Sequence, residues 1–114
     1  MTHNLYLVYS RPPEGVSPQD FNRWYAAHAQ ENIESTGFVS AQRYEVREVE
    51  GSDEVGPDFH LALYEYAGDM SVWRKDLTAR IQSKDIVLPE WFPQIEFKSW
   101  RCRPEGGRLT PETH

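Results

Sequence analysis

Residues 4–47 read NLYLVYSRPPEGVSPQDFNRWYAAHAQENIESTGFVSAQRYEVR and predict a strand, a helix and a second strand. The first seven residues are rich in β-forming side chains and stop at Arg-Pro-Pro, which cannot continue inside a sheet. Ser17 suits a helix N-cap and Pro18 the first turn, so a helix is expected to begin there and to end near Gly37. The segment from Phe38 to Arg47 is expected to form the second strand.

The second half of the chain predicts the same kinds of element. Residues 48–57 are acidic, contain two glycines and are typical of a solvated hairpin loop, which leads into a strand at 59–66. Asp69 is expected to cap a second helix, and an apolar connection at 86–92 precedes a last strand at 95–103. The apolar stripe of this second helix consists of Val72, Trp73, Leu77 and Ile81.

The order strand, helix, strand, strand, helix, strand predicts an α+β fold of the ferredoxin-like βαββαβ type with a four-stranded antiparallel sheet. We expect one domain over residues 1–103 and a loosely ordered C-terminal tail at 104–114. Two helices cover only one face of such a sheet, yet the first and third strands are apolar on both faces. An uncovered apolar face implies a partner, so we expect a homodimer formed through the helix-free faces.

Composition and charge exclude several classes of partner. The formal net charge is −6 and the twelve basic residues are scattered, which argues against nucleic-acid binding. No segment approaches the run of about 20 apolar residues needed to cross a membrane, so we expect no membrane partner and a cytoplasmic protein. The single cysteine excludes an intrachain disulfide, and no spacing of ligands indicates a metal site.

One stripe of the first helix carries the candidate chemistry. Trp24 and His28 are four residues apart and therefore share a helix face. A histidine beside a large ring can titrate near neutrality and move protons on a flat organic substrate. Asn32 lies on the same stripe, where a purely structural helix would carry an apolar residue, and Tyr25 adds a further ring. The structural alternative is a partly buried His28 that a backbone carbonyl satisfies.

Arg43 is the second catalytic candidate, because a planar guanidinium suits a carboxylate or an enolate. The alternative is a salt bridge with Glu45 or Glu65. Further candidates for contacting a substrate lie elsewhere in the chain, and each has a structural alternative as packing or dimer interface: Tyr6, His60 and Trp91. A metal site formed by His28 and His60 lacks any supporting spacing, so we expect no metal.

The runs Asp20–His28 (DFNRWYAAH) and Gly37–Tyr44 (GFVSAQRY) resemble the EthD-like branch of the dimeric α+β barrel proteins. The resemblance implies a cofactor-independent isomerase, or a lyase or cyclase, that acts on an unsaturated carboxylic acid from aromatic ring cleavage, as in the breakdown of lignin-derived compounds. It implies proton transfer by His28, a carboxylate or enolate held by Arg43, and a pocket shaped by Trp24. The alternatives are a small monooxygenase of the same superfamily, either cofactor-free or haem-using, and a non-catalytic dimeric binding or accessory protein.

Overall fold

The computed structural model describes residues 3–35, 37–47, 50–51, 59–84 and 86–112. Its elements follow the predicted order and are β1 (Asn4–Arg11), α1 (Pro18–Ile33), β2 (Phe38–Glu45), β3 (His60–Tyr66), α2 (Met70–Gln82), a 3-10 turn (Phe92–Gln94) and β4 (Glu96–Cys102). Most of the predicted loop at 48–57 lies outside the described residues. The tail at 103–112 forms no helix or strand.

Local chemistry explains where the helices begin and end. The Ser17 hydroxyl accepts a hydrogen bond from the Asp20 backbone N–H at 3.1 Å, and the Asp69 carboxylate accepts one from Ser71 N–H at 2.8 Å. Helix α1 ends at Ile33, shortly before Gly37, whose φ of 99° favours glycine and turns the chain into β2. Both predicted N-caps are therefore confirmed.

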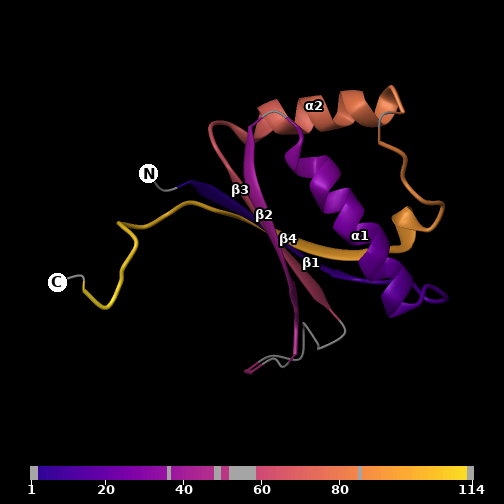
Figure 1. Cartoon of the computed structure of the whole chain (residues 1–114), viewed down its shortest axis with the longest axis horizontal. Helices are drawn as coiled ribbons and strands as arrows, with labels where there is room; N and C mark the ends of the chain where they lie inside the picture. Colours follow the sequence, from indigo (N-terminus) through magenta and orange to yellow (C-terminus); the bar gives the residue numbers. More distant parts are fainter. Residues whose placement is uncertain (1–2, 36, 48–49, 52–58, 85, 113–114) are drawn as a thin grey trace.

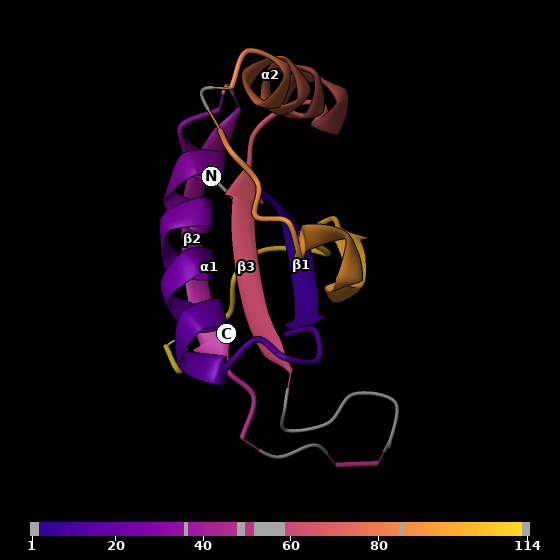
Figure 2. The same ribbon diagram turned by 90° about the vertical axis from the view of Figure 1, so that its right-hand side faces the viewer.

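The sheet has the strand order β2-β3-β1-β4, and its neighbouring strands are antiparallel. This order and the βαββαβ sequence of elements are those of the ferredoxin-like α+β fold, which confirms the predicted fold class. Both helices lie on the same side of the sheet (Figure 1). Helix α1 runs alongside β2 and β3, whereas α2 lies across one end of the molecule (Figure 2).

The main core fills the space between α1 and the sheet. Phe21 and Tyr25 of α1 are buried against the inward side chains Val8, Ala62 and Tyr64. A second cluster, formed by Tyr66, Met70 and Trp73, packs the beginning of α2 against the end of β3. Burial of these rings is the main source of stability, because apolar burial contributes about 25 cal/mol per Å². The two clusters leave room between α1, α2 and the sheet.

None of the described helices lies on the opposite face of the sheet (Figure 1). Strand pairing places the outward side chains of all four strands on this face, among them Leu5, Leu7, Tyr9, Tyr44, Leu61, Leu63 and Trp100. Tyr44 is 50% exposed and Trp100 is 44% exposed, which is unusual for large rings in a folded domain. The described helices do not include one that is long and apolar enough to span a membrane.

Candidate functional site

A cavity of about 350 Å³ lies between α1, α2 and the helix-covered face of the sheet. Its volume is at the lower end of the range for small-molecule sites. Seven of its lining residues are aromatic: Tyr6, Tyr25, Phe38, Tyr64, Trp73, Phe92 and Phe97. A few polar side chains interrupt these walls, namely His28, Asn32, Arg74, Thr78 and Ser99. Apolar walls with a small number of polar groups are typical of a site for a flat organic ligand.

His28 is held at this cavity by aromatic packing. Its ring stacks on Trp24 with the centroids 4.8 Å apart and the planes 14° from parallel. The rings of Tyr25 and Phe92 pack against it in edge geometry, with their centroids 6.2 and 6.1 Å from that of the imidazole. Only 11% of the side chain is exposed, and Nδ1 is buried without a hydrogen-bond partner. This packing fixes the orientation of the imidazole. Among the described residues, no backbone carbonyl forms a hydrogen bond with Nδ1, which was the structural alternative predicted from the sequence.

Burial lowers the pKa of His28 from 6.5 to about 4, because the charged ring loses its hydration. The nearest carboxylate oxygen, Glu31 Oε1, is 3.7 Å from Nδ1 and is too distant for a hydrogen bond. The ring is therefore neutral near pH 7, unlike the near-neutral titration predicted from the sequence. A neutral imidazole with a fixed orientation is suited to accept a proton.

Tyr64 places a hydroxyl group on the sheet side of the cavity. The Asn32 side-chain amide donates a hydrogen bond to this hydroxyl oxygen at 3.2 Å. Burial raises the pKa of Tyr64, and burial together with the neighbouring Tyr64 raises the pKa of Tyr25 well above its ordinary value. Both phenols therefore stay protonated, and the Tyr64 hydroxyl remains able to donate its own proton to a ligand.

Several buried polar atoms around the cavity have no partner. Within the described part of the chain they include His28 Nδ1, Asn32 Oδ1 and Trp73 Nε1, and all three residues line the cavity. An unsatisfied buried polar group costs about 1–3 kcal/mol. A fourth such atom among the described residues, Ser10 Oγ, lies outside the cavity lining, so three of these four gather at one cavity, which makes them candidates for binding a ligand.

Arg74 supplies positive charge to the same cavity. It extends from α2 with its guanidinium 5.7 Å from the centre of the Trp73 ring, and it is exposed to solvent. A guanidinium in this position suits a ligand that carries a carboxylate. The cavity thus combines a base, a hydroxyl donor, a cation and aromatic walls.

The structure brings four of the sequence-predicted residues together at this cavity, namely Tyr6, Tyr25, His28 and Asn32. Two others lie behind His28 instead of lining the cavity. Trp24 stacks on the imidazole, and Trp91 contacts the edge of Trp24 with the ring centroids 5.0 Å apart. Trp24 therefore supports the position of His28 directly, and Trp91 does so through Trp24.

Arg43 and His60 do not reach the cavity lined by His28. Both line a separate cavity of about 710 Å³ beside the connection from β1 to α1. The reason is register, because Ala41 is paired with Tyr64, whereas Arg43 lies two pairs and His60 four pairs further along the sheet. Each residue advances a strand by about 3.3 Å, so these two side chains lie about 7 and about 13 Å beyond the Tyr64 pair.

Among the described residues, Arg43 contacts α1 and no carboxylate. Its guanidinium donates to the Asn22 side-chain oxygen at 2.8 Å and lies 4.9 Å from the centre of the Tyr25 ring. Burial lowers the pKa of Arg43 and that of His60. The described contacts do not include the predicted alternative, a salt bridge with Glu45 or Glu65.

The cavity residues that were not predicted from the sequence as site residues include Tyr64, Trp73 and Arg74. Tyr64 faces the helices because it alternates with Leu63 and Glu65 along β3. Its partner on β1 is Tyr6, a predicted site residue, so knowledge of this pairing would have indicated Tyr64 as well. Trp73 belongs to the predicted apolar stripe of the second helix. It is buried, and it also lines the cavity. For Arg74 no sequence signal exists. Among the residues that the structure describes, no cluster of three or more histidine, cysteine or acidic side chains offers a metal site.

No model of a known protein family matches the sequence. No curated protein matches it either. The fold is similar to several solved structures. The protein At3g17210 from Arabidopsis thaliana matches with a TM-score of 0.63 at 9% identity, over 93% of this chain and 99% of that one. A protein named as a candidate monooxygenase from Shewanella loihica PV-4 matches with a TM-score of 0.52 at 10% identity, over 94% and 99%.

A mutant of MhuD, which holds two manganese protoporphyrin IX molecules per active site, matches with a TM-score of 0.51 at 18% identity, over 91% of this chain and 99% of that one. At identities this low, the three likenesses establish the fold alone and do not establish the reaction. The relation to EthD-like proteins stays a prediction. The chain has the ferredoxin-like α+β fold that these three proteins share.

Proposed function

We propose that this protein is a cofactor-independent isomerase that acts on an unsaturated carboxylic acid derived from aromatic ring cleavage. The observation that carries the proposal is a buried, neutral His28 at a cavity with aromatic walls. The rings favour a flat conjugated ligand, and a neutral imidazole favours proton abstraction over proton donation as the first step.

The proposed reaction is a proton shuttle between oxygen and carbon. His28 accepts the enol proton of a hydroxylated dienoic acid and returns it to a carbon of the chain, which gives the keto tautomer. The former carbon–carbon double bond is then single and rotates. Reversal of the two proton transfers restores the enol with the other geometry, and His28 is again neutral. Proton transfer of this kind contributes roughly 10²–10⁴-fold to a rate.

Two further residues are assigned roles in this proposal. Arg74 holds the substrate carboxylate at the side of the cavity formed by α2, which is the role that the sequence had suggested for Arg43. The Tyr64 hydroxyl, oriented by the hydrogen bond from Asn32, donates to the oxygen on which negative charge develops. Both contacts gain strength as charge forms, so they favour the transition state over the bound substrate.

The test is turnover of a panel of hydroxylated dienoic acids, followed by their ultraviolet absorbance, with the wild-type chain and with His28→Gln. The proposal expects isomerisation by the wild type and a loss of at least about 100-fold in the variant. Arg43→Gln serves as the matched control, because Arg43 lines the other cavity, and it is expected to keep turnover. Binding of these acids without turnover would instead favour the binding or accessory protein.

A cofactor-free monooxygenase is the second candidate, because His28 could deprotonate a phenol as well, and one structural neighbour is named as a candidate monooxygenase. The electron-rich anion would then react directly with oxygen. Consumption of oxygen with a phenolic substrate would favour this candidate. Binding of haem with its absorption band would instead favour a haem-using version.

We also propose that the protein is a homodimer that buries the helix-free sheet face. The support is the row of outward apolar side chains on this face, which includes the half-exposed rings of Tyr44 and Trp100. A closed two-fold contact covers the same patch on both copies and leaves the cavities on the helix side accessible.

A further inference from the structure

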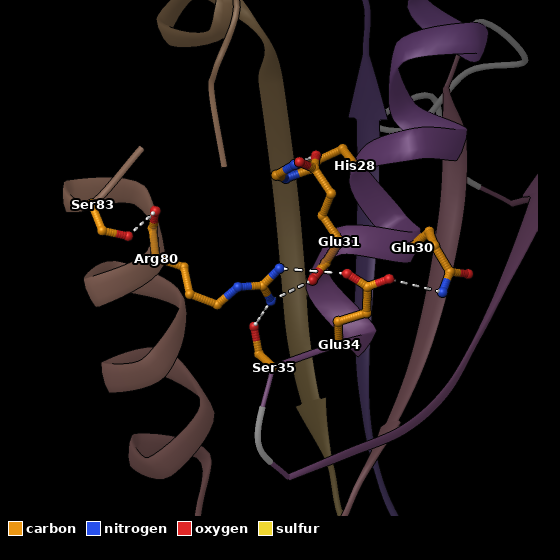
Figure 3. A network of polar contacts seen from close by, with 7 residues as sticks. All are labelled: His28, Gln30, Glu31, Glu34, Ser35, Arg80 and Ser83. Carbon is orange, nitrogen blue, oxygen red and sulfur yellow. Dashed lines mark hydrogen bonds and ion pairs between the residues drawn. The ribbon is translucent and has the colours of Figure 1, made fainter. Parts of the chain in front are cut away.

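The last turn of α1 is tied to α2 by one arginine (Figure 3). The Arg80 side chain donates hydrogen bonds to the Glu31 backbone carbonyl at 2.7 Å and to the Ser35 hydroxyl at 2.8 Å. Its second terminal nitrogen lies 3.5 Å from the Glu34 carboxylate. Only 19% of the Arg80 side chain is exposed, so these bonds form in a partly buried setting where they fix the turn firmly.

This arrangement leaves the Glu31 carboxylate unused by Arg80. Arg80 binds the main-chain oxygen of Glu31 and the side chain of Glu34, whereas the side chain of Glu31 turns back towards His28 (Figure 3). Glu31 Oε1 lies 3.7 Å from His28 Nδ1, the buried nitrogen that has no hydrogen-bond partner. His28 lines the cavity and Nδ1 is its buried nitrogen, so we take Nε2 as the nitrogen that meets a ligand.

The other ionisable groups around His28 do not compete for this position. They are Tyr25 on α1, Tyr6 and Tyr64 on the sheet, and Arg74 on α2. The pKa values of Tyr25 and Tyr64 are raised by burial, so these two groups are neutral near pH 7, and Arg74 has the wrong charge to stabilise an imidazolium. Glu31 is therefore the carboxylate placed to interact with a protonated His28.

We infer that Glu31 is a positioning residue for the base: the negative charge of its carboxylate, 3.7 Å from Nδ1, favours the tautomer that carries the proton on Nδ1, leaves the Nε2 lone pair to the cavity, and stabilises the imidazolium that forms when a substrate proton is taken up. The inference rests on the proposed function for its catalytic part. While His28 is neutral, the contact is long and weak. Once Nε2 accepts a proton, a full charge faces the carboxylate, so the interaction is strongest in the charged state.

The role of Arg80 follows from the same geometry. By binding the Glu31 carbonyl, it fixes the turn of α1 that carries this carboxylate, and by pairing with Glu34 it draws the second carboxylate of that turn away from the imidazole. Residues that orient a catalytic base in this way act through it and do not touch the substrate.

The experiment has an arm that does not depend on turnover. The imidazole ¹⁵N shifts of His28, assigned by difference against His28→Gln, report its tautomer at about pH 7. The inference expects the Nδ1–H form in the wild type and in Glu34→Gln, and a loss of that preference in Glu31→Leu, which has no acceptor. Glu34 is the matched control, because it lies in the same turn and its carboxylate faces Arg80. An Nε2–H form in the wild type, or the same tautomer in Glu31→Leu, would overturn the inference.

The second arm measures turnover of the hydroxylated dienoic acid with which the wild type is most active. Glu31→Gln keeps the size of the side chain and removes its charge, so kcat is expected to fall about tenfold while KM stays within about twofold. Glu34→Gln is expected to match the wild type. Unchanged kcat in Glu31→Gln would refute the positioning role. If no acid is turned over at all, the proposed function fails, and the tautomer arm alone decides the inference.

Discussion

Acidification should destabilise this protein through His28, and the effect has a defined size. The folded-state pKa of about 4 lies below the ordinary value of 6.5, so between these values the unfolded chain binds a proton that the folded chain does not. The contribution of His28 to stability is therefore complete above about pH 6.5 and is lost as the pH falls towards 4. Each pKa unit is worth about 1.4 kcal/mol, which gives about 3 kcal/mol in total.

Most of this loss, about 2 kcal/mol, should appear between about pH 7 and about pH 4.5. Urea unfolding followed by the fluorescence of the four tryptophans measures it, with the wild type and His28→Gln compared at both pH values. His60 and the carboxylates are present in both proteins, so their contributions to the pH dependence of stability cancel in the comparison. Between these two pH values, the free energy of unfolding of the wild type is expected to fall by about 2 kcal/mol more than that of the variant. Equal losses in the two proteins would refute the argument that burial keeps His28 neutral.

Three further predictions concern assembly, the hydroxyl donor and metals. Leu63→Glu on the helix-free face should convert the dimer to a monomer, as measured by light scattering, whereas Ala27→Glu on the exposed side of α1 should leave the dimer intact. A monomeric wild type would contradict the proposed assembly. Tyr64→Phe removes only a hydroxyl and should lower kcat about 10- to 100-fold with KM little changed, so a variant as active as the wild type would exclude Tyr64 as the donor. Exhaustive chelation should leave turnover intact, and loss of activity that one divalent ion restores would show a metal requirement.

The fold was predictable because its determinants are local. The Ser17 and Asp69 caps, the Arg-Pro-Pro stop and the alternation of apolar residues each depend on a few neighbouring positions, and the structure has the elements that they indicate. The helical stripe was equally informative. A period of 3.6 residues is sufficient to put Tyr25, His28 and Asn32 on one face, and a cavity lies beside that face.

The part of the site that was not predictable depends on register and on the second helix. Alternation along β2 gives the face on which Arg43 lies, but its position along the sheet follows from pairing with Ala62, which the sequence does not reveal. Trp73 combines burial in the core with a place in the cavity wall, and the spacing of apolar residues on α2 does not separate these roles. Arg74 became a candidate only when α2 was seen to border the cavity.

The central claim is that His28 moves a proton on a substrate in the aromatic cavity. Incorporation of deuterium from the solvent tests this claim most directly. A hydroxylated dienoic acid incubated in D₂O with the wild type should acquire deuterium at the carbon that is protonated in the keto form, at a rate well above that in buffer. With His28→Gln the rate is expected to fall by at least about 100-fold, while Arg43→Gln, altered at the other cavity, keeps the wild-type rate. Incorporation by His28→Gln at the wild-type rate would contradict the account, because the proton would then be moved by a group other than His28.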